Sequence, residues 1–566
     1  MATLYFINGG FTDQWNDVNN WSLSSGGASA SVRPTSSDDV IVDSNSPATI
    51  RVGATLGFTT PVCRNLTVDT GFAVNFIFTQ FYALRIYGTL NLLGTIGNEI
   101  TLAYNYTYPT YRNFLLFGTC GTVTHVNATK INSFGGKRII FNASTCTIDT
   151  CPFWIDHTPT TRHITNATEL QAINDNPHDD YILDNDIDMT GVNTWVPIGS
   201  KTLGIDIGSS ALYVLQDSFT GTFNGQGHTI SNLTYSAPSN RGYSYAALFG
   251  AVGSGLNPDG AFIRPTIENL TVRNCNFTGN NSCAGMVGFL ISAEMLNCHV
   301  INATIFSNST NAFSMGGFGG DCYGWTNMQT IINNCDVDTL NLTSNSSVGG
   351  FLGDSFCQSA SSNFSIFQCY VNNAHITGVD DNGGDVGGFI GDCEGTVVKC
   401  YVNNVVMDCK GAGNWGGGFG LLEASITNFY CNGSIVNANY ESGGFAGYVD
   451  DSTILNCYAD VNVSGDGLSD NDLGGFIGRL ESFMSPTVTN CYSTGIVSGQ
   501  TNIGGFIGLM STGTTLTNCS WFTGSNANAI GSYQGGSSKA TLAEISAGTD
   551  EPDNTQFYKT DHPVYA

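Results

Sequence analysis

The sequence predicts an all-β protein whose main part is a right-handed parallel β-helix, a solenoid, preceded by a β-rich N-terminal cap or anchor module. The first observation is a repeat. The phrase GGFxG, or a near relative, occurs eight times in the second half of the chain, from a degenerate copy at Gly285 to the copy that begins at Gly504. Phe445, Phe476 and Phe506 of the last three copies are 31 and 30 residues apart. Such a period indicates units that cannot bury their own apolar faces and must stack on their neighbours.

The second observation is an alternation of apolar and polar residues within each unit. In the run Ile454–Val463, period two places on one face Leu455, Cys457, Ala459, Val461 and Val463. Helical repeats need a 3.6-residue apolar stripe and tolerate little glycine, whereas these units alternate with period two and are bounded by Gly, Asn, Asp and Ser. A unit of about 30 residues with short strands and glycine corners is typical of one coil of a parallel β-helix. Stacked coils place equivalent residues about 4.8 Å apart, which predicts ladders of Phe, of Cys and of Asn.

The third observation is the composition. The chain has 70 Gly, 41% apolar residues and only 11% charged residues, which is typical of turns and strands rather than helices. Its formal charge of −27 excludes nucleic acid and anionic membrane as partners, because so few basic residues cannot neutralise phosphates. No run is long and apolar enough to cross a bilayer, so no membrane partner is expected. The segment Met1–Asn8 lacks the features of a secretory signal, which favours a protein used without export, such as a virion protein.

Three regions follow one another along the chain. Residues 1–160 form the β-rich N-terminal module, which opens with Trp15 and Trp21 and is expected to anchor the protein. Residues 161–525 carry the repeats and form the β-helix. Residues 526–566 form a C-terminal cap or tail rich in Gly, Ser and Ala. Because the ends of a solenoid expose unpaired strand edges, the two flanking regions are expected to cap or dock those ends.

The 18 cysteines are expected to be mostly free thiols rather than a disulfide framework. Nine of them recur once per unit in an inward-facing strand, where a small apolar thiol packs well: Cys275, Cys298, Cys335, Cys369, Cys400, Cys431, Cys457, Cys491 and Cys519. We expect these to form an interior ladder that includes Cys400, Cys431 and Cys457. Cys146 and Cys151 are close enough in sequence to bridge or to bind a metal ion. No zinc-binding spacing of Cys and His occurs.

Three aspartates occupy equivalent places in successive repeats. Asp321, Asp354 and Asp392 each follow a glycine phrase, so a solenoid would stack them. Carboxylates about 5 Å apart bind a cation or share protons, and glycosidases use a similar spacing. Solvated turn residues, a calcium site and a catalytic pair are therefore the three readings, in that order. Apart from calcium at this place, no cofactor is expected.

Four tyrosines stand next to the repeat cysteines. The alternation points Tyr370, Tyr401, Tyr458 and Tyr492 outward. Exposed tyrosine rings on an acidic, Asn-rich surface suit carbohydrate binding, because rings stack on pyranose faces and amides bond to hydroxyls. The alternative is that these rings only pack between neighbouring coils.

The order of motifs resembles the entry to a GLUG-repeat β-helix. The segments that carry the resemblance are Ile164–Gln171, Tyr181–Met189, Pro197–Gly199 and Phe219–Leu233. Such repeats occur in bacterial surface adhesins, in the non-catalytic part of some IgA-cleaving metallopeptidases and in viral appendage proteins. The resemblance covers roughly residues 164–560 and brings no catalytic motif, since no HExxH is present. The N-terminal opening, with Trp-Asn-Asp and Asn-Asn-Trp-Ser, is similar to modules of tailed-phage structural proteins.

These features together predict a structural and adhesive protein without enzymatic activity. The first interpretation is a tailed-phage fibre or appendage component in the virion that contacts glycans on the host surface. A bacterial cell-surface adhesin is the alternative, and a tailspike-type polysaccharide-degrading enzyme is the third. The expected partners are virion or appendage proteins bound through the N-terminal module, a host glycan, and further copies of the chain in a homo-oligomer.

Overall fold

The structure is a computed structural model of the 566-residue chain. It describes residues 2–545 except 8, 10–11, 53–59, 70, 79–82, 105–113, 130, 132–138, 142, 150, 152–153, 156–159, 201–217, 238–244, 254–263, 280–281, 308–313, 325–328, 345–346, 358–363, 379–383, 410–412, 468–471, 482–485, 512–513, 523–527 and 535–542. The chain divides into two compact units, one containing Met1–Thr160 and the other Thr161–Lys201, Ser218–Gly253 and Arg264–Ala566. Across the described ranges, no helix is long and apolar enough to cross a membrane.

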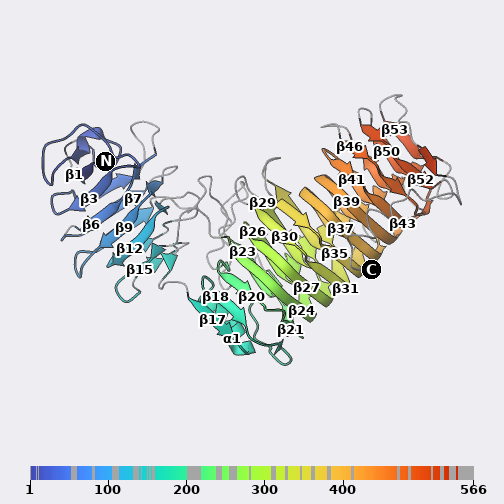
Figure 1. Ribbon diagram of the computed structural model, residues 1–566, viewed down its shortest axis with the longest axis horizontal. Helices are drawn as coiled ribbons and strands as arrows, with labels where there is room; N and C mark the ends of the chain where they lie inside the picture. Colours follow the sequence, from blue (N-terminus) through green and yellow to red (C-terminus); the bar gives the residue numbers. More distant parts are fainter. Residues whose placement is uncertain are drawn as a thin grey trace. The chain divides into compact units, whose positions relative to one another are not determined.

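The first unit is itself a small parallel β-helix (Figure 1). One sheet has the order β12-β9-β6-β3-β1-β2, with β12 (Thr119–Thr124), β9 (Thr89–Leu93), β6 (Leu66–Asp69), β3 (Asp39–Asp43), β1 (Thr3–Phe6) and β2 (Trp21–Ser22). A second has the order β15-β13-β10-β7-β4, with β15 (Thr147–Asp149), β13 (Val126–Thr129), β10 (Ile100–Tyr104), β7 (Val74–Phe78) and β4 (Thr49–Val52). The remaining strands are β11 (Phe114–Leu116), β8 (Leu84–Ile86), β5 (Val62–Cys63), β14 (Ile139–Ile140) and β16 (Trp154–Ile155). All described pairs between these named strands are parallel except β1 with β2.

The tryptophans of the N-terminal module close the core of this first unit. Trp15 precedes and Trp21 directly follows the short helix η1 (Val18–Asn20), and both side chains are buried. Their ring centroids lie 4.9 Å apart, and the ring of Phe6 lies 4.9 Å from that of Trp21. The indole of Trp21 donates a hydrogen bond to the carbonyl of Trp15 at 2.9 Å. These rings therefore stabilise the module, and any anchoring contact has to come from other residues.

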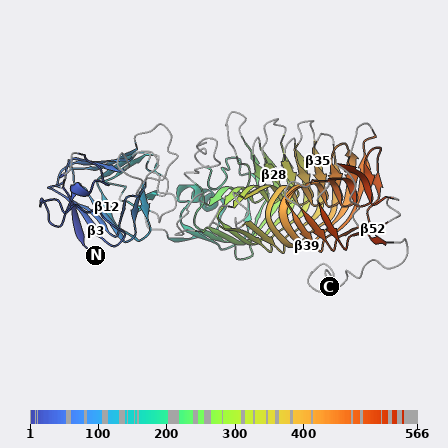
Figure 2. The same ribbon diagram turned by 90° about the horizontal axis from the view of Figure 1, so that it is seen from above.

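The second unit is a parallel β-solenoid, as predicted, whose coils are drawn from teal to red in Figure 1 and seen from above in Figure 2. It begins with β17 (Thr161–Ile164), helix α1 (Ala167–Ala172) and η2 (Ile173–Asp175), whose buried Leu170 and Ile173 cover the start of the core. A full coil has four strand positions, which we call A, B, C and D in chain order. Glycine bends separate A from B, and left-handed residues separate C from D.

The A strands form a sheet of their own: β25 (Cys283–Ala284), β28 (Ser314–Gly316), β32 (Ser347–Gly349), β36 (Val386–Gly387), β38 (Trp415–Gly416), β40 (Ser442–Gly443), β44 (Leu473–Gly474) and β49 (Ile503–Gly504). The B strands are β23 (Phe249–Gly253), β26 (Val287–Ile291), β29 (Gly319–Gly324), β33 (Leu352–Cys357), β41 (Ala446–Val449), β45 (Ile477–Leu480), β50 (Ile507–Ser511) and β53 (Ile530–Gln534). Two long strands run through positions B, C and D: β37 (Ile390–Asp408) and β39 (Phe419–Ala438).

The C strands stack on β17 in the order β18 (Asp180–Leu183), β20 (Thr222–Asn224), β30 (Thr330–Asn333), β34 (Phe364–Phe367), β42 (Thr453–Leu455), β46 (Thr487–Thr489) and β51 (Thr515–Thr517). Two strands run through C and D: β24 (Thr266–Thr278) and β27 (Glu294–Phe306). The D strands are β19 (Ile187–Asp188), β21 (Thr229–Ser231), β22 (Thr234–Ser236), β31 (Asp336–Ser344), β35 (Tyr370–Gly378), β43 (Tyr458–Gly465), β47 (Tyr492–Ser493), β48 (Val497–Ser498), β52 (Ser520–Phe522) and β54 (Ala543–Ile545).

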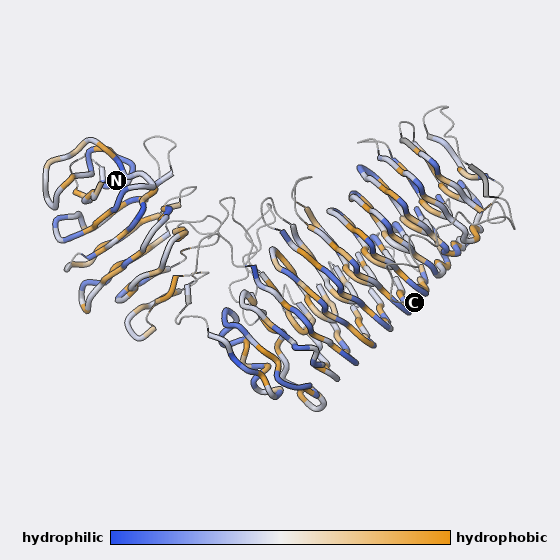
Figure 3. Tube along the Cα trace, viewed as in Figure 1, coloured by the Kyte–Doolittle hydropathy of each residue, from blue (hydrophilic) through white to orange (hydrophobic). Residues whose placement is uncertain are grey.

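Most of the predicted C-terminal cap, residues 526–566, lies outside the described residues. Within it, β53 pairs with β50 and β54 pairs with β52, so both strands continue the solenoid. One hydrophobic core runs through the second unit from Ile164 to Ile530. Figure 3 shows apolar and polar residues alternating along the coils around this core.

The predicted asparagine ladder stands at the bend between C and D. Asn456 has a φ of 55°, and its amide donates a hydrogen bond to Asn428 of the preceding coil at 3.2 Å. Asn490 and Asn518 continue the ladder at 3.0 and 2.8 Å. Asparagine tolerates this left-handed conformation better than most residues, and the residue shifts the alternation by one position. For this reason Ile454 is buried and Leu455 points outward, which corrects the predicted inner face.

Glycine is required in the repeated phrase by close approach of the backbone. A Cβ atom added to Gly474 would lie 1.8 Å from the carbonyl oxygen of Ile477 in the same bend. One added to Gly475 would lie 2.2 Å from the carbonyl oxygen of Gly505 in the next coil. Neither contact leaves room for a side chain, so the two glycines fix the bend and the coil spacing together.

The predicted phenylalanine ladder is present but has one gap. Phe318, Phe351 and Phe389 stack with ring centroids 4.8 and 4.9 Å apart, and Phe445, Phe476 and Phe506 stack at 4.5 and 4.9 Å. The gap lies in the coil between these two stacks. Gly418 takes the ladder position there, and the ring of Phe429 fills the gap from the other side of the core. Its centroid lies 5.3 Å from Phe389 and 5.7 Å from Phe445.

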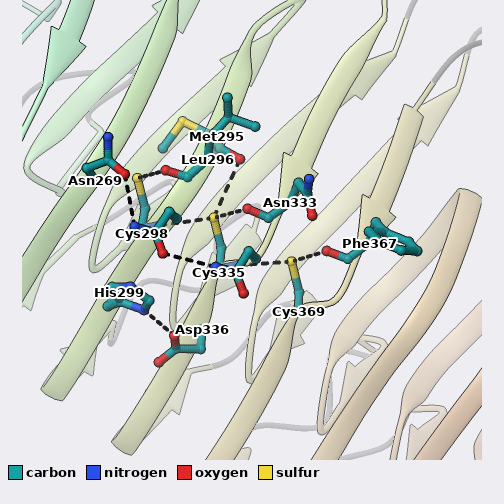
Figure 4. A network of polar contacts seen from close by, with 12 residues as sticks. Asn269, Met295, Leu296, Cys298, His299, Asn333, Cys335, Asp336, Phe367 and Cys369 are labelled. Carbon is teal, nitrogen blue, oxygen red and sulfur yellow. Dashed lines mark hydrogen bonds and ion pairs between the residues drawn. The ribbon is translucent and has the colours of Figure 1, made fainter. Parts of the chain in front are cut away.

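The cysteine ladder is confirmed in outline and corrected in membership. All 18 cysteines are free. The amide N–H of Cys298 donates to Sγ of Cys335 at 3.4 Å, and Cys335 repeats this contact with Cys369 (Figure 4). Each thiol in turn donates to a carbonyl oxygen near its own bend, as Cys335 does to Asn333 at 3.4 Å. The ladder thus satisfies buried N–H groups as well as filling space.

Two predicted members do not belong to this ladder. Cys400 pairs with Phe429, whereas Cys431 lies two residues further along and pairs with Val402 and Ala459. Cys275 pairs with Ala303, and the ladder position in its strand is held by Leu270. An Asn-Cys dipeptide in the sequence does not by itself fix which residues of neighbouring coils pair, because the number of residues per coil varies.

Candidate functional site

The three predicted aspartates stack on the outer side of the B strands. Asp321 pairs with Asp354, and Asp354 pairs with Asp392, in three consecutive coils. All three are partly buried, and Ser282 donates a hydrogen bond to Asp321. The predicted stack is therefore present. Asp385, which directly precedes strand β36, and Glu394 lie close enough to Asp354 for their charges to raise its pKa.

The stack disfavours ionisation. Burial raises the pKa of Asp354 well above its ordinary value, and the charges of Asp392 and Asp321 raise it further. Burial and the charge of Asp385 raise the pKa of Asp392. Burial also raises the pKa of Asp385 to about 6, although Asn414 donates a hydrogen bond to its carboxylate at 2.7 Å. The predicted consequence of stacking, at least one raised carboxyl pKa, agrees with these directions.

A positively charged residue stands in the same outward row three coils after Asp392. Leu421 and Tyr448 follow Asp392 in register, and Arg479 comes next. The Arg479 guanidinium lies 2.6 Å from Glu481 and 3.3 Å from Glu441. Within the described part of the chain, no group of three or more His, Cys, Asp or Glu side chains is arranged to hold a metal ion. Calcium at the aspartate stack therefore stays a prediction without a preformed ligand set.

The predicted tyrosines belong to one row on the outer side of the D strands. Tyr370 pairs with Tyr401, Tyr401 with Tyr430, Tyr430 with Tyr458, and Tyr458 with Tyr492. Tyr430 was missed because it precedes Cys431 instead of following a ladder cysteine. Its position directly after Phe429, which holds the cysteine place in the ladder, is the signal that identifies it.

The tyrosine rings stack on one another. The centroids of Tyr370 and Tyr401 lie 4.8 Å apart with an interplanar angle of 12°, and those of Tyr458 and Tyr492 lie 4.0 Å apart at 23°. Tyr401 and Tyr492 are only 4% and 6% exposed, so the expectation of exposed rings is wrong for these two. Because neighbouring rings cover the faces, a sugar meets mainly ring edges and hydroxyls here. The geometry matches the alternative reading, in which the rings pack between coils.

Amide and acidic groups accompany the tyrosine row. The amide of Asn432 donates to the hydroxyl of Tyr430 at 2.5 Å and to Asn403 at 3.0 Å. In the earlier coils the tyrosine row continues as His299 and the buried Asp336, which contact each other through Nδ1 and a carboxylate oxygen (Figure 4). Sequence reasoning also missed this pair, because the two residues share no motif and are 37 positions apart.

Comparison with known proteins places a recognised repeat in this fold. Residues 438–464, from the end of β39 to near the end of β43, match the GLUG motif. A stretch of 72 residues is 43% identical to halomucin of Haloquadratum walsbyi; it covers 13% of this chain and 1% of halomucin. The chain therefore carries a GLUG motif within its parallel β-solenoid.

One solved structure is similar over a longer range. A putative immunoglobulin A1 protease from Bacteroides ovatus has a TM-score of 0.33 and 19% sequence identity, over 64% of this chain and 84% of that chain. So low a score carries no argument about fold or activity.

Proposed function

We propose that the protein is a non-enzymatic, structural and adhesive β-helix that acts outside the cell. The observation that carries the proposal is that equivalent residues return in register once per coil along the solenoid, as the pairing of five tyrosines on consecutive coils illustrates. A surface that repeats once per coil suits an extended ligand better than a single small substrate.

The GLUG motif and the halomucin match support a surface or extracellular location. The finer proposal is a virion appendage, in which the N-terminal module binds the particle and the solenoid contacts glycans of the host. It is supported by the likeness of the N-terminal module to phage structural modules and by the separate core of that unit. A bacterial cell-surface adhesin is the second candidate, favoured by the same GLUG motif.

Immunogold electron microscopy with an antibody to this chain tests location. Labelling of appendages on intact particles supports the virion proposal, and labelling of the cell envelope in the absence of particles supports the adhesin. Label confined to the cell interior contradicts both.

A truncation tests the role of the N-terminal module. Removal of residues 1–160 leaves the core of the second unit intact, because that core contains no residue before Ile164. We expect the truncated protein to keep a β-sheet circular dichroism spectrum while losing incorporation into its parent particle or surface. Incorporation of the folded truncated protein at the level of the full chain would place the anchor elsewhere.

A further inference from the structure

A row of hydroxyl groups runs along the outer face of the C strands. Its members are Cα partners in five consecutive coils: Ser365, Thr396, Ser425, Thr453 and Thr487. All five are exposed or partly exposed. None of their hydroxyls bonds to another residue of the described chain, so each can donate to and accept from a ligand. We call this the hydroxyl row.

A second row lies beside it on the same face. Two residues further along each strand stand Phe367, Val398, Thr427, Leu455 and Thr489, again as Cα partners and partly exposed. Residues two positions apart in a strand point to the same side. We call these five the apolar row, because three of its members carry only hydrocarbon. Neither row contains a charged residue, although the chain carries 45 acidic residues.

The same two lines of positions form a pocket in the first coils. Its volume is about 390 Å³, and it is lined by Thr161, Asp180, Tyr181, Ile182, Thr222, Asn224, Thr266 and Glu268. Asp180 accepts hydrogen bonds from the N–H and the hydroxyl of Thr222, both at 2.8 Å. Asn224 donates to Glu268 at 2.7 Å. The pocket is large enough for a small ligand and rich in oxygen acceptors, which favour a ligand with many hydroxyls and repel an anion.

We infer that the outer face of the C strands binds a neutral, linear polysaccharide that runs along the stack of coils. The inference rests on the proposed adhesive function and assigns the glycan contact to a face other than the tyrosine row. A pyranose presents hydroxyls at its edge and C–H groups on its faces. The hydroxyl row contacts the edge of the sugar ring, and the apolar row contacts one of its faces. Because the coils repeat about every 4.8 Å, the same contacts are available at each successive coil.

The pocket and the two rows lie on one path. Glu294 and Ile331 occupy the intervening coils between Thr266 and Ser365. Arg264 lies 2.5 Å from Glu294 and so neutralises the charge that stands between the pocket and the hydroxyl row. One sugar unit sits in the pocket, and the following units extend over the uncharged rows.

The test uses the full-length protein with cellohexaose, chitohexaose and polygalacturonate as probes in isothermal titration calorimetry. The test variant is Thr396→Val, Thr453→Val and Thr487→Val, which removes three hydroxyls while keeping shape and strand propensity. The control variant is Thr278→Val, Thr304→Val and Thr343→Val, which makes the same changes on the D strands. A pocket variant, Glu268→Ala, and light scattering of every variant complete the set.

We expect at least one neutral hexasaccharide to bind and polygalacturonate not to bind. The triple variant on the hydroxyl row should weaken binding at least tenfold and Glu268→Ala at least threefold, with the control unchanged. Undiminished binding by the triple variant overturns the inference and leaves the adhesive function standing. The inference is also overturned if the triple variant has a lower oligomeric mass while its saccharide binding is unchanged. That result would mean that this face is an interface between copies of the chain. If no probe binds while the protein still attaches to its target surface, the inference fails alone; failure of attachment as well removes the proposed function.

Discussion

At the scale of single residues, buried polar atoms at the bends determine which substitutions the coils accept. The thiol of Cys335 accepts a hydrogen bond from Cys298 and donates to Asn333, so it serves two backbone groups at once. The thiol of Cys431 instead donates to the carbonyl of Gly444 at 3.1 Å. Ser493 occupies the place of Cys431 two coils later, and its hydroxyl donates to the equivalent carbonyl of Gly505 at 2.7 Å. The two cysteines should therefore respond differently to serine.

Cys335→Ser is expected to lower the free energy of unfolding by about 1–3 kcal/mol, because the shorter side chain leaves a buried N–H poorly bonded. Cys431→Ser should cost less than about 1 kcal/mol, since the fold already bonds a serine at that position. Urea denaturation of the two variants beside the wild type measures both. Equal losses in the two variants would show that the thiols act only as space-filling groups.

The ladder thiols should also be inert in the folded protein. Burial raises the pKa of Cys298, Cys335 and Cys369 far above the ordinary value, so reactive thiolate is scarce. We expect no labelling of these residues by iodoacetamide under native conditions and full labelling in denaturant, as read by mass spectrometry. Rapid native labelling, or disulfides among them, would contradict the ladder.

The aspartate stack makes stability depend on pH. A carboxyl group with a raised pKa binds its proton more tightly in the folded chain than in the unfolded chain, so the free energy of unfolding falls as pH rises between the two values. For Asp385 these are the ordinary 3.8 and about 6, and Asp354 and Asp392 shift in the same direction. The contribution of these carboxyl groups to the free energy of unfolding is thus greatest below about pH 4, and it is lost as the pH rises through about 6 and above.

Asp354→Asn with Asp392→Asn should remove most of this dependence and raise the free energy of unfolding near neutral pH by about 1–3 kcal/mol. Urea midpoints at about pH 5 and pH 8 measure it, with Asp460→Asn on the D strands as a matched Asp-to-Asn control outside the stack. A double variant with the same slope as the wild type would mean that the stack is compensated by groups near it.

At the scale of elements, one coil has exchanged the positions of two core residues. Gly418 leaves the phenylalanine stack open, and Phe429 replaces the ladder cysteine and fills that space. A Cβ added to Gly418 would lie 3.0 Å from the ring of Phe429, so both positions cannot be large. The pair preserves the volume of the core. This explains how a coil with different residues at these two positions still stacks in register.

Phe429→Cys should cost about 3–5 kcal/mol through the cavity it leaves, and Gly418→Phe should also destabilise by overpacking. The double variant restores the arrangement of the neighbouring coils and should recover most of the loss. A double-mutant cycle from urea unfolding gives the coupling energy. Additive losses in that cycle would mean that the two side chains do not share one space.

At the scale of the whole molecule, the repeat period and the alternation predict the solenoid, because stacking is the only way for each unit to bury its apolar face. They also predict the Asn and Phe ladders and the aspartate stack. They do not predict register inside a coil, since one left-handed residue such as Asn456 shifts the alternation. For that reason Leu455, Cys431 and Tyr430 were misplaced or missed.

The candidate sites were less predictable than the fold. The tyrosines were recognised as outward, but the stacking that buries Tyr401 depends on neighbours in other coils. The hydroxyl row is invisible in the sequence because Ser365, Thr396 and Ser425 follow no fixed motif and become neighbours only when the coils stack. Side chains separated by one coil meet across a variable number of residues, so spacing alone does not pair them.

The central claim is that equivalent side chains of successive coils lie in register, and a cross-linking measurement tests it most directly. Thr453 and Thr487 are Cα partners, whereas Ser425 and Thr487 are two coils apart. Adjacent strands are about 4.8 Å apart, within reach of a disulfide, and twice that distance is beyond it. Mild oxidation of Thr453→Cys with Thr487→Cys should therefore give an intramolecular disulfide detected by mass spectrometry, and Ser425→Cys with Thr487→Cys should give none. A bridge in the second pair and not in the first would contradict the register on which every ladder and row depends.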